Sequence, residues 1–412
     1  MSSEANPKIK STPSALEGYR NQIDIIDQQL VLLLEQRAQI VFAVGQYKRE
    51  NNLPAYDPAR EAKIKTRVRQ LTSKNGPMSC DEMESVFGKL VESFRLIEKA
   101  HMQKQNALSL FQEAHIDFNK PQQVVLWGFG LLGSSFYLAL QKTVPHWNFL
   151  IVDPQLNVDL FMSWKEQHHL TNIDLINSQQ MHQADIYVLG AAVEINAKHL
   201  QQFSFPKNSL VIDFGSTKEV MAQAFQKRAQ NSLTHFYYVG GHPLAGKESS
   251  GFQNGDPLLF YNKVFCWIEP SSQKTNKKIK TTCEVLALGL GAIPYWTSAE
   301  EHDTALAWTS HLPQLLSSTL ATCLADKKFS QTAELFPGVI SDLLRISGSS
   351  FSMWQSIFSS NQSKLIEALS ELIQHLHLVQ KNLSNTKACE KLFQDSNQFF
   401  KIFQELKNKK GA

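Results

Sequence analysis

Apolar residues recur at alternating intervals of three and four positions through the first part of the chain. They stand at Leu16, Tyr19, Ile23, Ile26, Leu30 and Leu33, and again at Ile40, Val44 and Tyr47. This spacing lines one face of a helix about thirty residues long, which must pack lengthwise on other helices. A second helix is expected to open near Asp57, and a third to run from about Cys80 to Gln105. The first domain, residues 14–104, is therefore predicted to be all-helical.

Basic residues interrupt the apolar face of this first helix. Arg37 occupies one of its positions, and Lys48 follows about three helical turns later on the same face. One such arginine would usually extend its charge out of the bundle along its aliphatic stem. Two cations on one interior face, with Arg20 and Arg60 added, instead indicate a pocket for a small dianion. Arg20 falls on a different helical face, so one copy of this helix cannot readily aim both Arg20 and Arg37 at one ligand, whereas a second copy of the chain could supply Arg20.

Residues 14 to about 104 resemble the all-helical chorismate mutases. The resemblance implies an intertwined homodimer in which each site takes residues from both chains. Arg37 and Arg60 would grip the substrate carboxylates, and Arg20 of the partner subunit would complete the site. The implied reaction, chorismate to prephenate, needs no nucleophile, only preorganised charge around a compact conformer of the substrate.

The same resemblance assigns the other residues of this site. Lys48 and Glu98 would contact the ether oxygen of the breaking bond. Asp57 and Glu61 would hold the region of the ring hydroxyl. One position departs from the family pattern, because Phe94 stands where the third helix usually carries a serine. This departure bears on the efficiency of the mutase more than on its identity.

A different pattern begins at Val124, where four apolar residues run into a series of glycines. Gly128, Gly130 and Gly133 follow this predicted strand, and helical periodicity resumes directly after them. Such a loop binds the pyrophosphate of a dinucleotide. Its first glycine permits the tight turn, the second allows close approach of the phosphates, and the third lets the helix pack on the strand. A chance glycine turn in another α/β domain is the alternative.

A second apolar run, residues 149–152, ends on Asp153, about twenty residues past the last glycine. A carboxylate at this place holds the ribose hydroxyls of NAD and repels the additional phosphate of NADP. We therefore expect NAD as the cofactor. The predicted cofactor-binding residues are Gly128, Phe129, Gly130, Leu131, Leu132, Gly133 and Asp153.

Further apolar runs alternate with helical segments, at residues 185–193, 209–213 and 236–239. The alternation predicts a parallel sheet in an α/β Rossmann-type domain, residues 121–298, with residues 155–183 mostly helical. Ser216 and His242 follow two of these runs, at the carboxyl edge where such sheets bind ligands. A neutral imidazole beside a nicotinamide can take a proton from an alcohol as hydride leaves its carbon. A Ser–His hydrolase would need a GxSxG turn or a third acid partner, and the sequence offers neither.

From Val124 to its C-terminus the chain resembles the prephenate and arogenate dehydrogenases. Besides the glycine loop, the matching motifs are GSTK at 215–218, GGHPLAGKESSG at 240–251, HDTALAWTSHLP at 302–313 and DLLRISGSSFSMW at 342–354. By this resemblance His242 accepts the proton of the ring 4-hydroxyl while hydride passes from that carbon to NAD. The ring carboxylate leaves as carbon dioxide, and aromatisation drives the reaction, so no metal is implied.

The same motifs assign the other residues of this second site. Ser216 would orient His242, and Arg345 would bind a substrate carboxylate. The residues that line or close the site would be Glu248, Ser310 and Trp354. Gln314 stands where many prephenate-using relatives carry a histidine, close to the group that is a ketone in prephenate and an amine in arogenate. Arogenate therefore stays an alternative substrate.

Helical periodicity dominates residues 299–412, which we expect to form an all-helical dimerisation domain and the second wall of the active site. Arg345 is flanked here by Leu343, Leu344 and Ile346. An unpaired guanidinium would be costly to bury among them, so Arg345 is expected to need an acid partner or an anionic ligand.

Composition narrows the remaining possibilities. The chain has 412 residues, 41 basic against 38 acidic, with a net charge of +3, which gives no sign of nucleic-acid binding. Its five cysteines are scattered and include no CxxC pair, so neither a disulfide framework nor a zinc site is indicated, and a reducing cytoplasm fits best. No apolar run approaches the roughly eighteen residues of a membrane span.

The sequence thus predicts a multidomain, cytoplasmic, homodimeric enzyme of tyrosine biosynthesis. By the resemblances, it would rearrange chorismate to prephenate and then convert prephenate to 4-hydroxyphenylpyruvate with NAD. The alternatives are a dehydrogenase acting on arogenate, another hydroxyacid dehydrogenase, and a non-catalytic sensor of NAD or prephenate. The joint presence of Ser216, His242 and Arg345 argues against the sensor.

Overall fold

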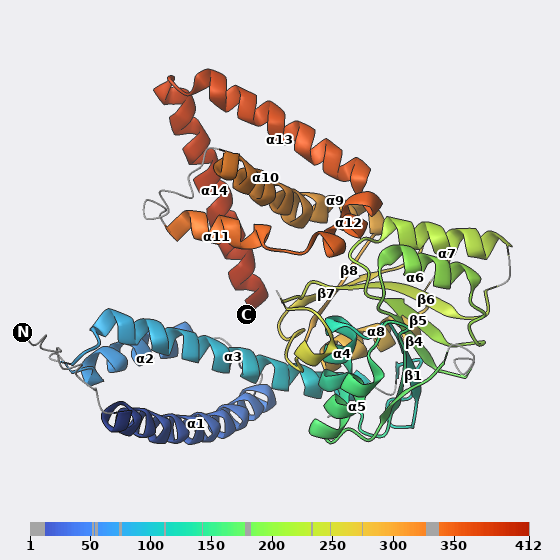
Figure 1. Ribbon diagram of the computed structural model, residues 1–412, viewed down its shortest axis with the longest axis horizontal. Coiled ribbons are helices and arrows are strands. Elements are labelled where there is room, and N and C mark those ends of the chain that lie inside the picture. Colours follow the sequence, from blue (N-terminus) through green and yellow to red (C-terminus); the bar gives the residue numbers. More distant parts are fainter. Residues whose placement is uncertain are drawn as a thin grey trace, which may run out of the picture. The chain divides into compact units, whose positions relative to one another are not determined.

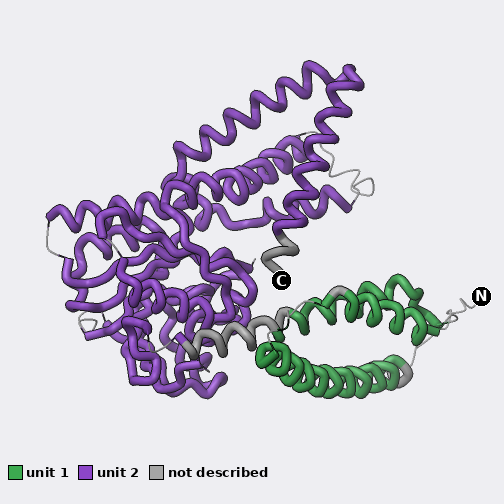
Figure 2. Tube along the Cα trace, turned by 180° about the vertical axis from the view of Figure 1, so that it is seen from behind, with its two compact units in different colours: residues 1–102, 411–412 green, residues 103–410 purple. Residues whose placement is uncertain are grey.

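The structure is a computed structural model that describes residues 13–51, 53, 57–73, 76–110, 113–141, 143–177, 183–231, 234–247, 249–273, 275–326 and 338–411. The chain divides into two compact units, one ending at residue 102 and the other running from residue 103 to residue 410 (Figure 2). None of the described helices is both long and apolar enough to cross a membrane.

The described part of the N-terminal unit consists of the helices α1 (Pro13–Glu50), α2 (Pro58–Leu71) and α3 (Cys80–Leu110), drawn in blue to cyan in Figure 1. Helix α2 begins where predicted because the Asp57 carboxylate accepts a hydrogen bond from the Arg60 N–H at 3.0 Å. Pro58 fits the first turn, where its missing N–H costs nothing. Arg69 of α2 reaches Asp81 at 2.5 Å and Glu84 at 2.6 Å, which ties α2 to the start of α3.

The apolar face of α1 is not covered by the described residues of a single chain. Its exposed fractions run from 42% at Val44 to 65% at Tyr19 and Ile40. Single exposed apolar side chains are ordinary, but a continuous apolar stripe along a helix marks an interaction surface. The face that was predicted to pack on other helices is therefore left open by the residues that the structure describes in one chain.

The second unit is built on an eight-stranded sheet in the order β3-β2-β1-β4-β5-β6-β7-β8. Figure 1 labels β1 and the strands from β4 to β8. Its strands are β1 (Gln123–Trp127), β2 (Asn148–Val152), β3 (Ile173–Leu175), β4 (Ile186–Leu189), β5 (Leu210–Asp213), β6 (Tyr237–Pro243), β7 (Val264–Ile268) and β8 (Ile293–Thr297). The pairs from β3 to β6 are parallel, β7 is antiparallel to β6, and β8 is parallel to β7. The strand order reverses between β1 and β4, which puts the ligand crevice of this fold at their carboxyl ends.

Helices cover both faces of the sheet. They are α4 (Leu131–Gln141), α5 (Val158–Gln167), α6 (Val193–Gln202), α7 (Glu219–Asn231) and α8 (Lys277–Gly289). Val124 and Leu126 of β1 pack in one core with α4, α5 and α8, whereas Val125 and Trp127 pack in another with α6 and α7. A strand buried on both sides must be apolar at every position, which is why β1 reads as a continuous apolar run.

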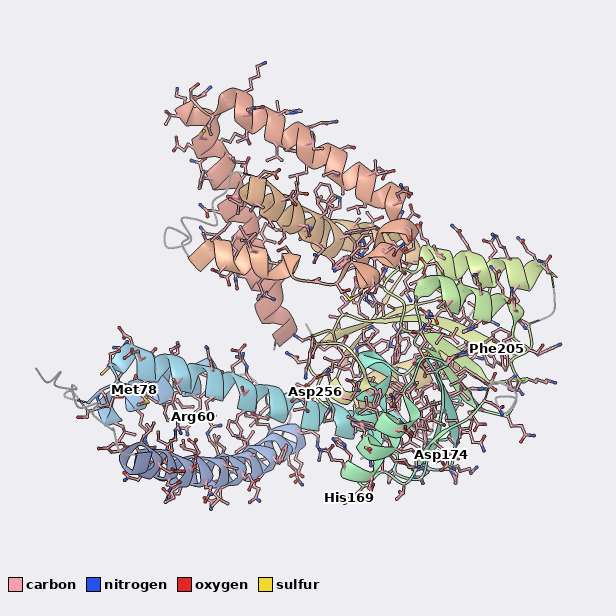
Figure 3. The ribbon with its side chains drawn as sticks, viewed as in Figure 1. Arg60, Met78, His169, Asp174, Phe205 and Asp256 are labelled. Atoms are coloured by element: carbon pink, nitrogen blue, oxygen red, sulfur yellow. The ribbon has the colours of Figure 1, made fainter. Side chains whose placement is uncertain are left out.

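The sheet departs from the sequence prediction in three respects. Residues 155–183 contain α5 as expected, but also the short edge strand β3, whose exposed Asp174 interrupts its apolar pattern (Figure 3). Strand β6 continues through Pro243 because residues 240–243 pair with β7, so His242 lies within a strand rather than after one. The strands β7 and β8 were not predicted.

The C-terminal part is helical, as predicted. Its helices are α9 (Ala299–Leu306), α10 (Leu312–Asp326), α11 (Gly338–Ser347), α12 (Phe351–Ser360), α13 (Gln362–Asn382) and α14 (Thr386–Gly411). A π-helical segment, Ala307–His311, continues α9 into α10. Large apolar side chains are exposed on the last two helices, among them Leu376, Leu378, Phe393, Phe399, Phe400 and Phe403. The predicted order of an all-helical domain, an α/β domain and an all-helical C-terminal domain is confirmed.

Candidate active sites

Two cations of α1 each meet a residue of α3. The guanidinium carbon of Arg37 lies 4.2 Å from the centre of the Phe94 ring. Further along α1, the Nζ of Lys48 lies 2.8 Å from the Oε1 of Glu98, a side chain that is buried. Phe94 and Glu98 are one helical turn apart. The two cations predicted to share a face of α1 therefore contact one face of α3.

Arg37 is partly desolvated and has an open hydrogen-bond donor. Its side chain is half-buried, and its Nη1 is buried without a hydrogen-bond partner among the described residues. Burial, together with the positive charge of Arg60, lowers the pKa of Arg37 from its usual value. The group stays a cation at any physiological pH. A desolvated guanidinium with unused N–H donors binds a carboxylate strongly.

A cavity of about 530 Å³ lies between Arg37 and one side of α2 (Figure 3 labels Arg60). Arg60, Lys63 and Arg67 line it at helical spacing, and none of the described residues around it is acidic. Lys63 and Arg67 were not singled out from the sequence, although their spacing from Arg60 was a usable signal. The cavity has the charge that a dianionic ligand requires.

The other predicted residues of this site lie elsewhere in the unit. Asp57 is exposed and caps α2. The Oε1 of Glu61 lies 3.2 Å from the Nη1 of Arg95, and both line a second cavity of about 290 Å³. Arg20 is exposed and lines neither cavity. One chain thus brings Arg37, Lys48 and Glu98 to the contact between α1 and α3 but leaves Arg20 apart.

The glycine loop after β1 has the geometry of a dinucleotide site. Gly128 has a φ of 98°, and a Cβ there would lie 2.7 Å from the backbone N of Ala191, so a side chain is excluded. A Cβ on Gly133 would lie 2.8 Å from the carbonyl oxygen of Gly128. A Cβ on Gly130 would meet nothing within 4 Å, which leaves open space at the start of α4. The loop can therefore take the pyrophosphate of a dinucleotide in the way predicted.

Asp153, which directly follows β2, supports this loop. Its Oδ2 accepts a hydrogen bond from the Phe129 N–H at 2.8 Å, and its Oδ1 accepts one from the Gln155 N–H at 3.0 Å. Each oxygen has a further lone pair, so ribose hydroxyls can still donate to the carboxylate. Phe129 is buried and its amide is bound to Asp153, so it holds the loop from inside. Leu131 and Leu132 are half-buried at the start of α4.

His242 of β6 is linked to a buried pair of residues on α9. Its Nδ1 lies 2.9 Å from the Nε2 of His302, and the Nδ1 of His302 lies 2.7 Å from the Oδ1 of Asp303. Asp303 in turn accepts hydrogen bonds from the backbone N–H groups of Lys218 at 2.8 Å and Glu219 at 2.9 Å. Glu219 is the first residue of α7, and the positive end of a helix favours a carboxylate there.

This chain of contacts sets the tautomer of both imidazoles. A carboxylate only accepts hydrogen bonds, so His302 donates to Asp303 through its Nδ1–H and accepts at its Nε2. A neutral His242 must then donate to His302 through its own Nδ1–H. The Nε2 of His242 is left without a proton and can accept one from a bound alcohol. His242 is only half-buried, so a ligand can reach it.

The surroundings of His242 keep it neutral. Burial is the main cause that lowers the pKa of His242 well below its usual value, and the positive charge of Lys218 lowers it further. Burial also lowers the pKa of His311 to about 4. The Nδ2 of Asn361 donates to the Nδ1 of neutral His311 at 3.1 Å, which holds that ring as well. A general base must be unprotonated before it acts, and this environment provides that form.

Lys218 ties the end of β5 to β6 beside His242. Its buried Nζ contacts the Asp213 carboxylate and donates to the Gly241 carbonyl oxygen at 2.6 Å. The hydroxyl of Tyr238 donates to the other oxygen of Asp213 at 2.8 Å. The buried cation is thus paired with a carboxylate and donates to a carbonyl oxygen, which offsets the cost of its burial. This pairing fixes the backbone of the residue that precedes His242.

Ser216, which was predicted to orient His242, is not hydrogen-bonded to it in the structure. Ser216 is half-buried in the loop between β5 and α7, and the hydrogen-bond partner of His242 is His302. His302 and Asp303 begin the motif HDTALAWTSHLP, so they were visible as a pair. The contact between His242 and His302 could not be predicted because the two residues are 60 positions apart and no local pattern joins α9 to β6.

The remaining predicted residues lie on the C-terminal helices. Ser310 is half-buried in the π-helical segment. Trp354 of α12 stands edge-on to His311 with ring centres 6.1 Å apart, and its Nε1 is buried without a described hydrogen-bond partner. Gln314 is buried, and its Nε2 lies 3.4 Å from the Ser318 hydroxyl. Glu248 lies outside the described residues.

Arg345 was expected to be buried among apolar residues, but the structure places it at the surface. It lies in the last turn of α11 but is exposed, so the predicted cost of burying an unpaired guanidinium does not arise. An exposed arginine can release water and bind a carboxylate at little cost. Among the described residues, no group of three or more His, Cys, Asp or Glu side chains could hold a metal ion.

Three family models match the chain. Chorismate mutase type II matches residues 19–99, the prephenate dehydrogenase nucleotide-binding domain matches residues 164–293, and the prephenate dehydrogenase dimerization domain matches residues 298–405. The second match begins after β2, so the role of the glycine loop rests on its geometry.

Individual relatives agree with these matches. The prephenate dehydrogenase of Lactococcus lactis is 28% identical over 298 residues, which are 71% of this chain and 79% of that protein. The T-protein of Haemophilus influenzae is 30% identical over 130 residues, 31% of each chain. The structure of A. aeolicus prephenate dehydrogenase with hydroxyphenyl propionate and NAD+ covers 68% of this chain and 98% of that one, at 22% identity and a TM-score of 0.59. Synechocystis arogenate dehydrogenase covers 68% and 99%, at 22% identity and a TM-score of 0.56.

Proposed function

We propose that this chain, which matches the models of chorismate mutase type II and of both prephenate dehydrogenase domains, is a bifunctional chorismate mutase/prephenate dehydrogenase whose two sites act in sequence in tyrosine biosynthesis. The helical domain, residues 14–104, rearranges chorismate to prephenate. The domains 121–298 and 299–412 convert prephenate to 4-hydroxyphenylpyruvate and carbon dioxide with NAD. The observation that carries the second step is the chain from Asp303 through His302 to His242, which presents an unprotonated imidazole nitrogen at the carboxyl edge of the sheet.

In the helical domain we assign the substrate carboxylates to Arg37 and Arg60. The open donor of Arg37 and the acid-free cavity that both residues line support this assignment. Lys48, beside Glu98, would donate to the ether oxygen as its bond breaks. Fixed charges stabilise the transition state without reorganising, which is all that an intramolecular rearrangement needs. Asp57 and Glu61 are assigned to the region of the ring hydroxyl by the family resemblance alone.

We assign the chain to a homodimer. The uncovered apolar face of α1 supports a second copy there, which would bring Arg20 of the partner subunit to the mutase site. The exposed apolar residues of α13 and α14 support a further contact within the matched dimerization domain. The five cysteines are free, which supports a reducing cytoplasmic location. No nucleic-acid partner is assigned.

NAD fits the crevice between β1 and β4. Gly130 leaves room for the pyrophosphate, and Asp153 has lone pairs for the ribose hydroxyls. When bound, NAD accepts the hydride from the ring carbon that carries the hydroxyl. The adjacent glycine loop and α4 provide the N-terminal end of a helix for the phosphates.

His242 accepts the substrate proton, and the residues around it stabilise the charge that it gains. Its Nε2 takes the proton of the ring hydroxyl while hydride leaves the same carbon. The bond to the ring carboxylate then breaks to release carbon dioxide and an aromatic ring. His302 accepts a hydrogen bond from the Nδ1–H of His242 and, with Asp303 behind it, stabilises the imidazolium that forms.

Arg345 is assigned to a substrate carboxylate. Ser216, Glu248, Ser310 and Trp354 are assigned to the lining of the site.

Purified protein mixed with chorismate and NAD is expected to produce NADH without any added enzyme. Chorismate is not a substrate of the dehydrogenase, so NADH appears only if the mutase first supplies prephenate. Absorbance at the NADH band follows the coupled reaction, and prephenate added directly follows the second step alone. Absence of NADH from chorismate, prephenate and arogenate would leave the non-catalytic sensor as the better description.

Arogenate is the second candidate substrate. Gln314 of α10 is buried beside Ser318. By the family resemblance, it stands where many prephenate-using enzymes carry a histidine. A neutral amide can accept from an amine as well as donate to a ketone. Comparing kcat/KM for prephenate and arogenate at one NAD concentration separates the two. We expect prephenate to be preferred, because the mutase in the same chain produces it.

The dehydrogenase is expected to stay active below pH 6.5, the ordinary pKa of histidine. The groups facing His242 are His302, Lys218 and His311, with Asp303 behind His302, and the pKa of His242 is lowered. A lowered pKa means that the base stays neutral as pH falls through 6.5 and becomes protonated only at more acid pH. The measurement is kcat/KM for prephenate across pH, which reports the free enzyme. A loss of activity centred on pH 6.5 or above would contradict the assigned environment.

A further inference from the structure

Phe94 and Arg37 form a contact that the assigned reaction does not by itself explain. Phe94 is 6% exposed, and the Arg37 guanidinium lies over its ring at 4.2 Å from the centre. This distance is well within the range of a cation–π interaction, which is strongest when water is excluded. The contact joins α1 to α3 one helical turn from the ion pair of Lys48 and Glu98.

An aromatic ring and a carboxylate hold a guanidinium in different ways. A carboxylate binds the N–H edge of the group, which is also the edge that a substrate carboxylate needs. A ring contacts only the flat face and leaves the N–H donors unused. Arg95 is held in the first way, by Glu61, and the ammonium of Lys48 likewise pairs with a carboxylate, that of Glu98. Arg37 has no carboxylate within ion-pair distance among the described residues, and its Nη1 is buried and unpaired.

We propose that Phe94 is a positioning residue of the mutase site, whose ring holds Arg37 by the face and keeps its N–H edge open for a carboxylate of the dianionic substrate. The inference rests on the proposed mutase function. It explains how a partly buried arginine is fixed without an acid that the substrate would have to displace. It also gives a role to Phe94 at a position where the third helix departs from the pattern of similar mutases.

The physical consequence is an effect on binding more than on chemistry. Arg37 would grip the carboxylate in both the bound substrate and the transition state, so losing its preorganisation raises KM and changes kcat little. Replacement of Phe94 by leucine keeps an apolar side chain but removes the ring. We expect Phe94→Leu to raise KM for chorismate about tenfold. Phe94→Tyr keeps the ring and is expected to stay within about twofold of the original enzyme.

The decisive test uses the full-length protein with phenylalanines of increasing fluorine content at position 94. Fluorine withdraws charge from the face of the ring while the size of the side chain changes little, so KM for chorismate is expected to rise stepwise along the series. A purely structural role would leave KM constant. The rate with added prephenate, measured on the same samples, reports the second site and is expected to stay the same.

Two results would overturn the proposal. One is a KM for chorismate that does not change along the fluorinated series, and the other is a Phe94→Leu variant whose KM for chorismate is unchanged. Both are read against the original enzyme, which must convert chorismate to prephenate. If the original enzyme has no mutase activity, the proposed function of the helical domain fails. If the original enzyme is active but KM for chorismate stays constant across the Phe94 variants, only the positioning role of Phe94 is rejected.

Discussion

The His242→Asn variant is expected to lose nearly all dehydrogenase activity, with kcat for prephenate lower by about a hundredfold to ten-thousandfold. Asparagine is similar in size and can still donate to the Nε2 of His302, so β6 and its neighbours should keep their arrangement. It has no basic nitrogen and cannot take the hydroxyl proton at neutral pH. The measurement is the rate of NADH formation from prephenate at saturating NAD.

The same chain provides the control for this variant. Its mutase site lies in the other compact unit, so prephenate formation from chorismate is expected to stay within about twofold of the original rate. NAD binding, followed by fluorescence titration, should also persist, because the glycine loop and Asp153 are untouched. A His242→Asn enzyme that still oxidises prephenate at its original rate would remove His242 as the base and with it the role of His302 and Asp303.

The Arg37→Ala variant is expected to reduce the mutase kcat/KM for chorismate by roughly two to three orders of magnitude. Arg37 is half-buried, its Nη1 has no partner among the described residues, and it lines the cavity together with Arg60. Its loss would therefore leave a substrate carboxylate without its partner. The loss of charge also removes the reason for the Phe94 contact. The measurement is the disappearance of chorismate without NAD.

Lys89→Ala is the matched control. Lys89 is also a cation of the helical unit, but it is exposed on α3 and lines neither cavity there. Its loss should leave the mutase rate nearly unchanged, which separates a specific contact from a general loss of positive charge. Both variants should oxidise added prephenate normally. An Arg37→Ala enzyme that matches Lys89→Ala in the mutase assay would contradict the assignment of Arg37 to a substrate carboxylate.

Features encoded by neighbouring residues were predictable. The apolar run of β1 and the three glycines after it predicted a strand, a turn and a helix, and the positive φ of Gly128 shows why the turn needs glycine. Asp57 predicted the start of α2 because a cap acts within one turn. The pairing of Lys48 with Glu98 came from the resemblance to known mutases, and the structure brings the two side chains together.

The sequence by itself determined the order of domains, the glycine loop, and the cations on the face of α1, because helical and strand periodicities are properties of residues close together in the chain. Only the tertiary structure decided the partner of His242, since His302 lies 60 residues away and its contact depends on how α9 packs beside β6 and α7. It also decided that Arg345 is exposed and that Phe94 holds Arg37. Hydrogen-bond partners and burial depend on packing between distant segments, and packing is not a local property of the sequence.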